Sequence, residues 1–162
     1  MSTEANKQLV LRWREELWHK RSLDALDQLC AADYIGRLAG TPGPVQGREA
    51  LKQLFAAYLA AFDVQVTSEF LVAEGDLVVV RDTNRFRHTG AFQGMPPTGK
   101  EGSITSTDIY RIVDGKVVEQ WVRVRLHRLL AAARPSPHAR AGNVAIAEGA
   151  SHATRRAQGH HS

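Results

Sequence analysis

The chain has 162 residues, 43% of them hydrophobic, a net charge of +4 and a single cysteine. This length and composition predict one folded domain with a sizeable core, and one cysteine excludes an intrachain disulfide. The N-terminus MSTEANKQ is polar, and the richest apolar run, residues 54–62, is too short to cross a bilayer. We therefore expect a cytoplasmic protein with no membrane partner.

The positive charge is concentrated at the C-terminus. Residues 134–162 hold four arginines and one glutamate, a net +3 of the total +4, which leaves +1 on residues 1–133. The segment is rich in Ala, Gly, Ser, Pro and His and has no aromatic residue, so we expect a disordered basic tail after a domain over 1–133. No aromatic platform or recognition helix accompanies these arginines, so nucleic acid is not the favoured partner.

Amphipathic helices are expected first along the chain. Residues 5–20 place Trp13 and other apolar side chains at helical spacing. Ser22 is expected to cap a second, shorter helix whose apolar pattern reaches Cys30, a buried and inert thiol. The break TPGPVQG at 41–47 precedes a third helix over 48–62 with a broad apolar face.

The hydrophobic period then changes to two, which predicts strands. They are expected over 64–72, 77–88, 103–113 and 117–127, with a turn at 74–76 and a short hairpin at Asp114–Gly115. Three helices followed by four strands predict an α+β fold with an antiparallel sheet. Helices packed on one face of a strongly curved sheet enclose a cone, which is a favourable place for an apolar small-molecule pocket.

The loop HTGAFQGMPPTGK, residues 88–100, is too apolar for a plain solvated linker. No helix begins after its glycines, so it is not a phosphate cradle. Phe92 and Met95 are expected to pack over the mouth of the cavity or against a neighbouring subunit. We therefore interpret this loop as the rim of a ligand pocket.

Four segments, in this order, resemble the SnoaL-like polyketide cyclases of the nuclear transport factor 2-like superfamily. They are VLRWREELWHKRSLDALDQLCAADY, GREALKQLFAAYLAAF, HTGAFQGMPPTGK and DIYRIVDGKVVEQW, and the resemblance spans about residues 6 to 131. It implies a curved sheet closed by three helices, homodimers formed through the convex sheet face, and no cofactor. The superfamily also includes isomerases, epoxide hydrolases, dehydratases and noncatalytic binders, so function has to be argued from the pocket.

Asp108 is the first candidate for catalysis. It lies on an apolar strand face beside Tyr110 and two isoleucines, and burial raises the pKa of a carboxyl group. A neutral carboxyl group can donate a hydrogen bond to a developing enolate, as in ketosteroid isomerase. The resemblance implies that this position matches the oxyanion-side acid of the isomerases and a functional histidine of the cyclases. The alternative is an aspartate that faces solvent or pairs with Arg81 or Arg111.

Several positions depart from what the resemblance implies. The proton-transferring acid of the cyclases falls on Val122, a second aspartate of the relatives falls on Arg125, and the general base of the isomerases falls on or near Leu38. Retained proton transfer would then depend on Asp108, or on His88 at the entrance of the loop.

Six residues are candidates for ligand contacts: Trp13, Gln120, Trp121, Tyr110, Phe92 and Met95. Trp13 fits a core position equally well. Gln120 and Trp121 point to opposite faces of a strand, and strand parity favours Gln120 inward and Trp121 at a dimer face or second core. The adjacent Arg81 and Asp82 also point to opposite faces, which weakens an epoxide hydrolase hypothesis.

The sequence thus predicts a cofactor-independent cyclase or isomerase that acts on a flat, mostly apolar molecule, such as an aromatic polyketide or a terpenoid, by acid–base proton transfer. The alternative is a noncatalytic dimer that binds a hydrophobic small molecule. An epoxide hydrolase is less favoured than either.

Overall fold

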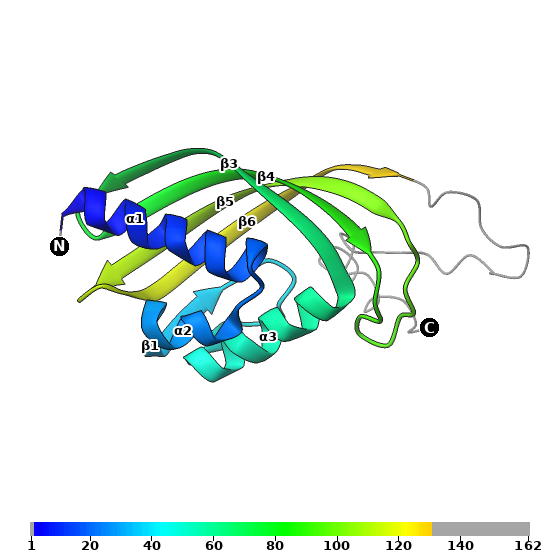
Figure 1. Ribbon diagram of the computed structural model, residues 1–162, viewed down its shortest axis with the longest axis horizontal. Helices are drawn as coiled ribbons and strands as arrows, with labels where there is room; N and C mark the ends of the chain where they lie inside the picture. The colour runs from blue at the N-terminus through cyan, green and yellow to red at the C-terminus, as the bar shows by residue number, and fades with distance from the viewer. Residues whose placement is uncertain (1, 131–162) are drawn as a thin grey trace, which may run out of the picture.

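A curved sheet of six strands arches over the helices in this computed structural model (Figure 1). Residues 2–130 are described, and the tail expected over 134–162 lies outside them. The strand order is β2-β1-β6-β5-β4-β3. The strands are β1 (Cys30–Arg37), β2 (Val45–Gln46), β3 (Phe62–Glu74), β4 (Leu77–His88), β5 (Glu101–Val113) and β6 (Lys116–Leu130).

The first helix, α1 (Thr3–Arg14), begins at Ser2, whose hydroxyl accepts a hydrogen bond from the Ala5 backbone N–H at 3.1 Å. It continues into a π-helical turn, η1 (Glu15–His19), and buries Val10, Trp13, Arg14 and Leu17. A short 3-10 helix, η2 (Leu23–Ala25), and α2 (Leu26–Leu29) follow, and α3 (Arg48–Ala61) comes after β2. Both α1 and α3 lie beneath the arch of the sheet (Figure 1).

The α+β class, the three helical segments and the four C-terminal strands are confirmed. The four predicted strands pair antiparallel, as expected, but the sheet as a whole is mixed, because it includes a parallel pair that the prediction did not contain. Cys30 begins β1, which runs parallel to β6, instead of continuing a helix. Burial of Tyr34 and Gly36, with Ile35 between them more exposed, is the alternation of a strand. Ser22 precedes η2 but its side chain makes no capping hydrogen bond.

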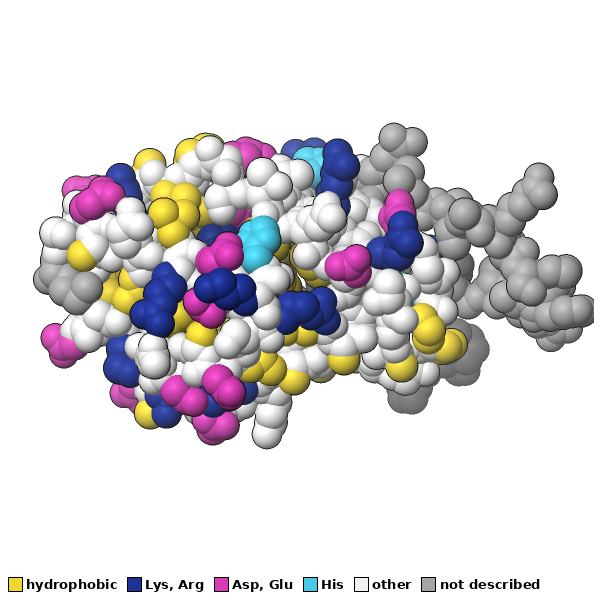
Figure 2. Space-filling model, viewed as in Figure 1, with side chains coloured by type: hydrophobic (Ala, Val, Ile, Leu, Met, Phe, Trp, Pro, Cys, Tyr) yellow, Lys and Arg dark blue, Asp and Glu magenta, His cyan; other side chains and the backbone are white. Residues whose placement is uncertain are grey.

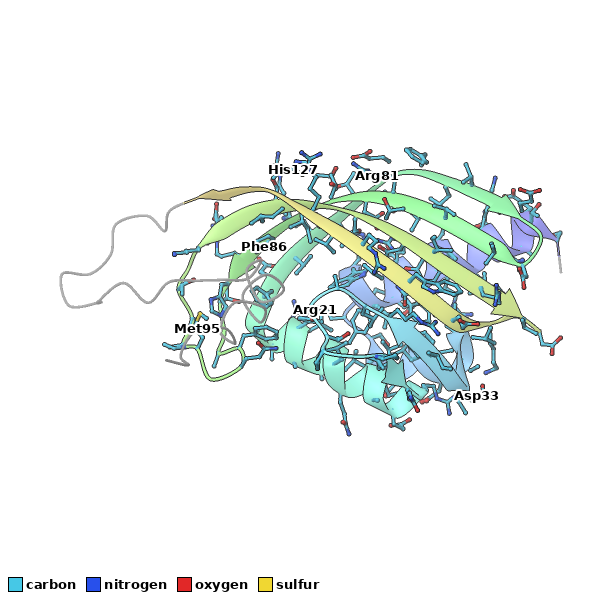
Figure 3. The ribbon with its side chains drawn as sticks, turned by 180° about the vertical axis from the view of Figure 1, so that it is seen from behind. Arg21, Asp33, Arg81, Phe86, Met95 and His127 are labelled. Carbon is cyan, nitrogen blue, oxygen red and sulfur yellow. The ribbon has the colours of Figure 1, made fainter. Side chains whose placement is uncertain are left out.

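The register of the strands assigns side chains to the two faces of the sheet. On β4, β5 and β6 the pairs Asp82↔Ser106, Asp108↔Val122 and Tyr110↔Gln120 share the concave face, toward the helices. Figure 3 shows Phe86 beneath the arch, whereas Arg81 and His127 project from its convex side. The hydrophobic core lies at the α1 end of the concave face, where the helices cover Val78, Val80 and Tyr110.

Two properties of residues 2–130 bear on function. None of their helices is long and apolar enough to cross a bilayer. Within the same residues, no three His, Cys, Asp or Glu side chains are grouped as they would be around a metal ion.

Candidate functional site

A buried arginine connects α1 to the concave face of the sheet. Arg14 is 4% exposed and lies at helical spacing from Val10 and Leu17, on the buried face of the helix. Its guanidinium forms an ion pair with Asp82 and lies 3.4 Å from Oδ2 of Asp108. It also donates a hydrogen bond to the Tyr110 hydroxyl at 2.7 Å. A buried charge is stable only with such partners, so this cluster fixes the end of α1 on the sheet.

The two aspartates of this cluster have different surroundings. Asp82 is 0% exposed, and both of its oxygens are occupied: Ser68 donates to Oδ1 at 2.8 Å, while Ser106, at 3.5 Å, and Arg14 contact Oδ2. In Asp108, Oδ2 accepts from Arg14 and from the Tyr110 hydroxyl at 3.3 Å, but the buried Oδ1 has no hydrogen-bond partner within the described part of the chain. The two oxygens of Asp108 therefore differ, because only Oδ2 is held by neighbouring side chains.

Burial raises the pKa of Asp108, and the charge of Arg14 opposes this effect without cancelling it. Burial also raises the pKa of Tyr110 well above its usual value, so the phenol beside Asp108 stays neutral. A carboxyl group whose pKa lies above its usual range exchanges a proton closer to neutral pH. Asp108 is thus suited to act as a general base or a general acid.

On β6, the concave face beside and beyond Asp108 is apolar and less covered. Val122 is its register neighbour on β6, and Val124, two residues further along the same face, is 41% exposed. Figure 3 shows Phe86 and Arg21 in the space between the sheet and α3. Asp108, 7% exposed, therefore lies at the boundary between the packed core and the more exposed apolar side chains of β6.

Three of the predicted ligand-binding residues lie next to Asp108. Trp13 is fully buried between Tyr34, with ring centroids 6.4 Å apart, and Tyr110, at 5.8 Å. The Tyr34 hydroxyl donates to Oε1 of Gln120 at 2.9 Å, on the same face of the sheet. Trp13 and Tyr110 have no exposed surface, so they form the floor beneath Asp108 and support its position.

The structure does not bring His88 and Asp108 together. His88 lies eight residues along β4 from Val80, the register partner of Asp108, which is roughly 26 Å of strand. It is 1% exposed, its Nδ1 lies 3.0 Å from the Thr98 hydroxyl, and its ring centroid is 5.1 Å from that of Phe62. His88 thus contacts residues at the base of the loop over 88–100 and none of the residues around Asp108.

The remaining predicted ligand contacts also lie away from Asp108. Phe92 packs on Tyr58 of α3, with ring centroids 5.4 Å apart, and pairs with Met95 within the loop. Trp121 lies on the convex face between the guanidinium groups of Arg37, at 5.7 Å, and Arg111, at 5.5 Å. Of the positions where relatives are expected to carry other groups, Val122 faces the concave side, Arg125 is exposed, and Leu38 is partly buried after β1.

Sequence reasoning missed Arg14 and the role of Asp82. The signal for Arg14 was its position between Val10 and Leu17 on the apolar face of the first helix. Arg81 and Asp82 do point to opposite faces. Asp82 forms its ion pair with Arg14 of α1, whereas Arg81 pairs with Glu69. The contact between Arg14 and Asp82 joins residues 68 positions apart, which no local pattern reveals.

Comparison with known proteins identifies one family over most of the chain. The family model for SnoaL-like polyketide cyclases matches residues 8–132. IdmH from Streptomyces antibioticus, named as a polyketide cyclase, is 30% identical with a TM-score of 0.63; the match covers 74% of this chain and 91% of IdmH. AclR from Streptomyces galilaeus, named as a hydroxylase, is 30% identical with a TM-score of 0.66 and coverages of 76% and 77%.

A third solved structure, a protein from Jannaschia sp. CCS1 named as a SnoaL-like polyketide cyclase, is 24% identical. Its TM-score is 0.70, and the match covers 75% of this chain and 86% of that one, which supports the same fold. A search of curated proteins gives no match.

Proposed function

Because the chain belongs to the SnoaL-like polyketide cyclase family, we propose that it is a cofactor-independent cyclase or isomerase in which Asp108 moves a proton. The substrate is a flat, mostly apolar molecule bound beneath the sheet. The observation that carries this proposal is Oδ1 of Asp108, which is buried without a hydrogen-bond partner among residues 2–130, while Oδ2 is held by Arg14 and Tyr110.

The proposed reaction requires a base and a substrate with an acidic C–H bond beside a carbonyl group. Ionised Asp108 removes a proton from the carbon beside a substrate carbonyl, and the electron pair of that C–H bond becomes an enolate. In a cyclisation the enolate carbon then forms a bond to a second carbonyl carbon, whereas in an isomerisation it is reprotonated elsewhere. The carboxyl group that carries the proton returns it to the product oxygen or carbon. The apolar Val122, the register partner of Asp108, offers the carboxylate no hydrogen bond.

Exchange of α-hydrogens provides a test that does not require the natural substrate. β-Tetralone is a flat, apolar ketone, and NMR in deuterium oxide reports its enolisation directly. We expect the protein to accelerate the exchange and Asp108→Asn to reduce that rate by roughly 10²–10⁴-fold, the usual contribution of a positioned acid or base. Because the pKa of Asp108 is raised, the exchange rate should increase with pH through a value above that of an ordinary aspartate.

Asp33→Asn is the matched control, because Asp33 is exposed on β1, away from the concave face (Figure 3). An Asp108→Asn protein as fast as wild type would refute the proposal. Binding of β-tetralone without exchange by either protein would favour the noncatalytic binder instead, an outcome consistent with Val122 at the position where the resemblance implies the acid of the cyclases.

Epoxide hydration is a second candidate, favoured by the two carboxyl groups that share Arg14. In such a reaction one carboxylate activates water and a second carboxyl group protonates the epoxide oxygen. Asp82 has no free oxygen and no exposed surface, so only Asp108 is available here, and we rank this function below proton transfer at carbon. Hydrolysis of styrene oxide that is lost in Asp108→Asn, without exchange of β-tetralone, would reverse the ranking.

A further inference from the structure

A line of hydrogen bonds crosses the concave face from Asp82 to Asn84 and leaves one buried oxygen without a partner. The Ser106 hydroxyl donates to Oδ2 of Asp82 at 3.5 Å, and Nδ2 of Asn84 donates to the Ser106 oxygen at 3.3 Å. Asn84 is 8% exposed, yet its carbonyl oxygen Oδ1 has no hydrogen-bond partner among residues 2–130. A buried acceptor in this state is unfavourable unless another molecule donates to it.

The direction of this line follows from the ion pair at its end. The carboxylate of Asp82, paired with Arg14, can only accept hydrogen bonds. Ser106 has one proton, and when that proton points to Asp82 the Ser106 oxygen can only accept. Asn84 must then turn its NH₂ group toward Ser106, which fixes an amide orientation that coordinates alone leave ambiguous. Its carbonyl oxygen therefore faces away from the polar line.

The surroundings of Asn84 are largely apolar. Its register neighbours are Val66 on β3 and Ile104 on β5. Val124, the register partner of Ser106 on β6, is 41% exposed on the same concave face. Phe86, two residues along β4, lies in the space beneath the arch (Figure 3). The unpaired carbonyl oxygen is thus on a part of the concave face where most neighbours are apolar and one of them, Val124, is exposed.

We propose that Oδ1 of Asn84 accepts a hydrogen bond from a hydroxyl group of the ligand. The protein then takes flat, mostly apolar molecules that carry a phenolic, enolic or alcoholic hydroxyl. This proposal rests on the proposed function for the location of the pocket and adds a second polar contact to it. Asn84 pairs with Ile104, four residues from Asp108 on β5, so the two contacts are separated by about 13 Å of strand. A ligand that reaches both is held in one orientation.

Calorimetric binding of β-naphthol and its methyl ether tests this preference, because the two compounds differ in the proton that Asn84 needs. We expect wild type to bind β-naphthol about tenfold more tightly than the ether, the effect of one hydrogen bond to a buried acceptor. In Asn84→Leu, which keeps the side-chain shape but removes the acceptor, the ratio should fall to about twofold or less. The affinity for the ether should not decrease.

Thr83→Val is the matched control, since Thr83 is the neighbouring residue on β4 and its hydroxyl bonds Glu69 on the convex face. It should retain the wild-type ratio. Ser106→Ala should lower the ratio because Asn84 is then free to turn, and it supplies the same comparison if near-ultraviolet circular dichroism shows that Asn84→Leu does not fold.

A wild-type protein without preference, a preference that survives Asn84→Leu, or no binding of either compound would overturn the proposal. Failure of the proposed function would be distinguishable from failure of this proposal. Exchange of β-tetralone that is insensitive to Asp108→Asn would remove the assignment of Asp108 but would leave the naphthol preference, which depends on Asn84, intact.

Discussion

Asp82 and Asp108 both pair with Arg14, but the two side chains have different roles. Asp82 is fully buried with both oxygens occupied, so it acts as the counterion that keeps the charge of Arg14 in the core. Arg14 is then only partly available to Asp108, at 3.4 Å. Desolvation of Asp108 consequently outweighs the attraction of the cation, which is why the pKa of this carboxyl group is raised.

Asp82→Asn should therefore lower the pKa of Asp108. The substitution removes a neighbouring negative charge and leaves Arg14 with a single carboxylate, and both effects favour the ionised form. The groups that face Asp108 from the other elements, Tyr34 on β1 and Gln120 and Val122 on β6, carry no charge that would oppose the change. A ¹³C NMR titration of the aspartate carboxyl groups measures it. Ser68→Ala, which removes a hydrogen bond to Asp82 but no charge, should leave the pKa of Asp108 nearly unchanged.

The same pKa has a consequence for stability. The folded protein binds a proton at Asp108 more tightly than the unfolded chain does, so between the unfolded and folded pKa values the native state holds more protons. Stability contributed by this group is present below the unfolded pKa and is lost as pH rises through the folded one. Asp82→Asn should reduce that loss. An Asp108 titration that stays at its wild-type position in this variant would contradict the role given to Asp82.

Strand parity alone is sufficient to place some of these residues. The alternation over 103–113 and 117–127 predicts that Asp108 and Gln120 face the same side, and they do. Arg14 cannot be placed with the same certainty, because arginine is most often a surface residue and its partner lies on a strand far along the sequence. The ligand-facing side of Asn84 depends on Ser106 and Asp82 together, which no single segment encodes.

Among the secondary-structure elements, the four C-terminal strands were predicted from the sequence pattern but β1 was not. The later strands are rich in β-branched residues with period-two alternation. β1 contains two alanines, an aspartate and a glycine, and its pairing with β6 is interrupted between Cys30 and Ile35. Its residues have weak strand propensity, so β1 is stabilised by tertiary contacts, including Tyr34 against Trp13 and Gln120. That explains why the parallel pair, and hence the mixed sheet, was not predicted.

The loop over 88–100 is anchored to α3 by its own backbone. The N–H groups of Thr89 and Gly90 donate to the Ala61 carbonyl at 2.9 and 3.0 Å, and a Cβ on Gly90 would lie 2.0 Å from the Ala60 carbonyl oxygen. Gly90→Ala should therefore displace the loop and destabilise the fold by about 1–3 kcal/mol. Urea denaturation measures the loss. Gly43→Ala is the control, because a Cβ there meets nothing within 4 Å, and an equally stable Gly90→Ala protein would contradict the anchoring.

At the scale of the whole molecule, the charge distribution gives no support for a polyanionic partner on the face that includes α1. Figure 2 shows basic and acidic side chains intermingled there, without a continuous basic surface. Exposed ion pairs of the described residues include Lys20 with Glu16 and Lys52 with Asp27. Paired exposed charges contribute little attraction at a distance, so this face has the character of a solvated surface.

The convex face of the sheet differs, because an apolar row crosses four strands. The register places Val72, Val79, Ile109 and Trp121 side by side. Phe70 and Val72 on the edge strand β3 are 55% and 54% exposed. Contiguous exposed apolar side chains mark association surfaces in soluble proteins, and a surface of this kind that pairs with its own copy gives a two-fold dimer. We therefore expect a homodimer formed through this face.

Val72→Glu tests this association by placing a charge in the apolar row. An unpaired charge buried in an interface costs enough to weaken the dimer by at least about 30-fold. Sedimentation velocity at micromolar concentration should show a dimer for wild type and a monomer for the variant, with unchanged circular dichroism. Leu11→Glu is the control, since Leu11 is 41% exposed on α1, away from the sheet. A monomeric wild type, or a Leu11→Glu protein that dissociates to the same extent, would show that the apolar row does not form a dimer interface. Because the row lies opposite Asp108, dissociation should also leave the exchange of β-tetralone unaffected, which separates assembly from catalysis in one set of variants.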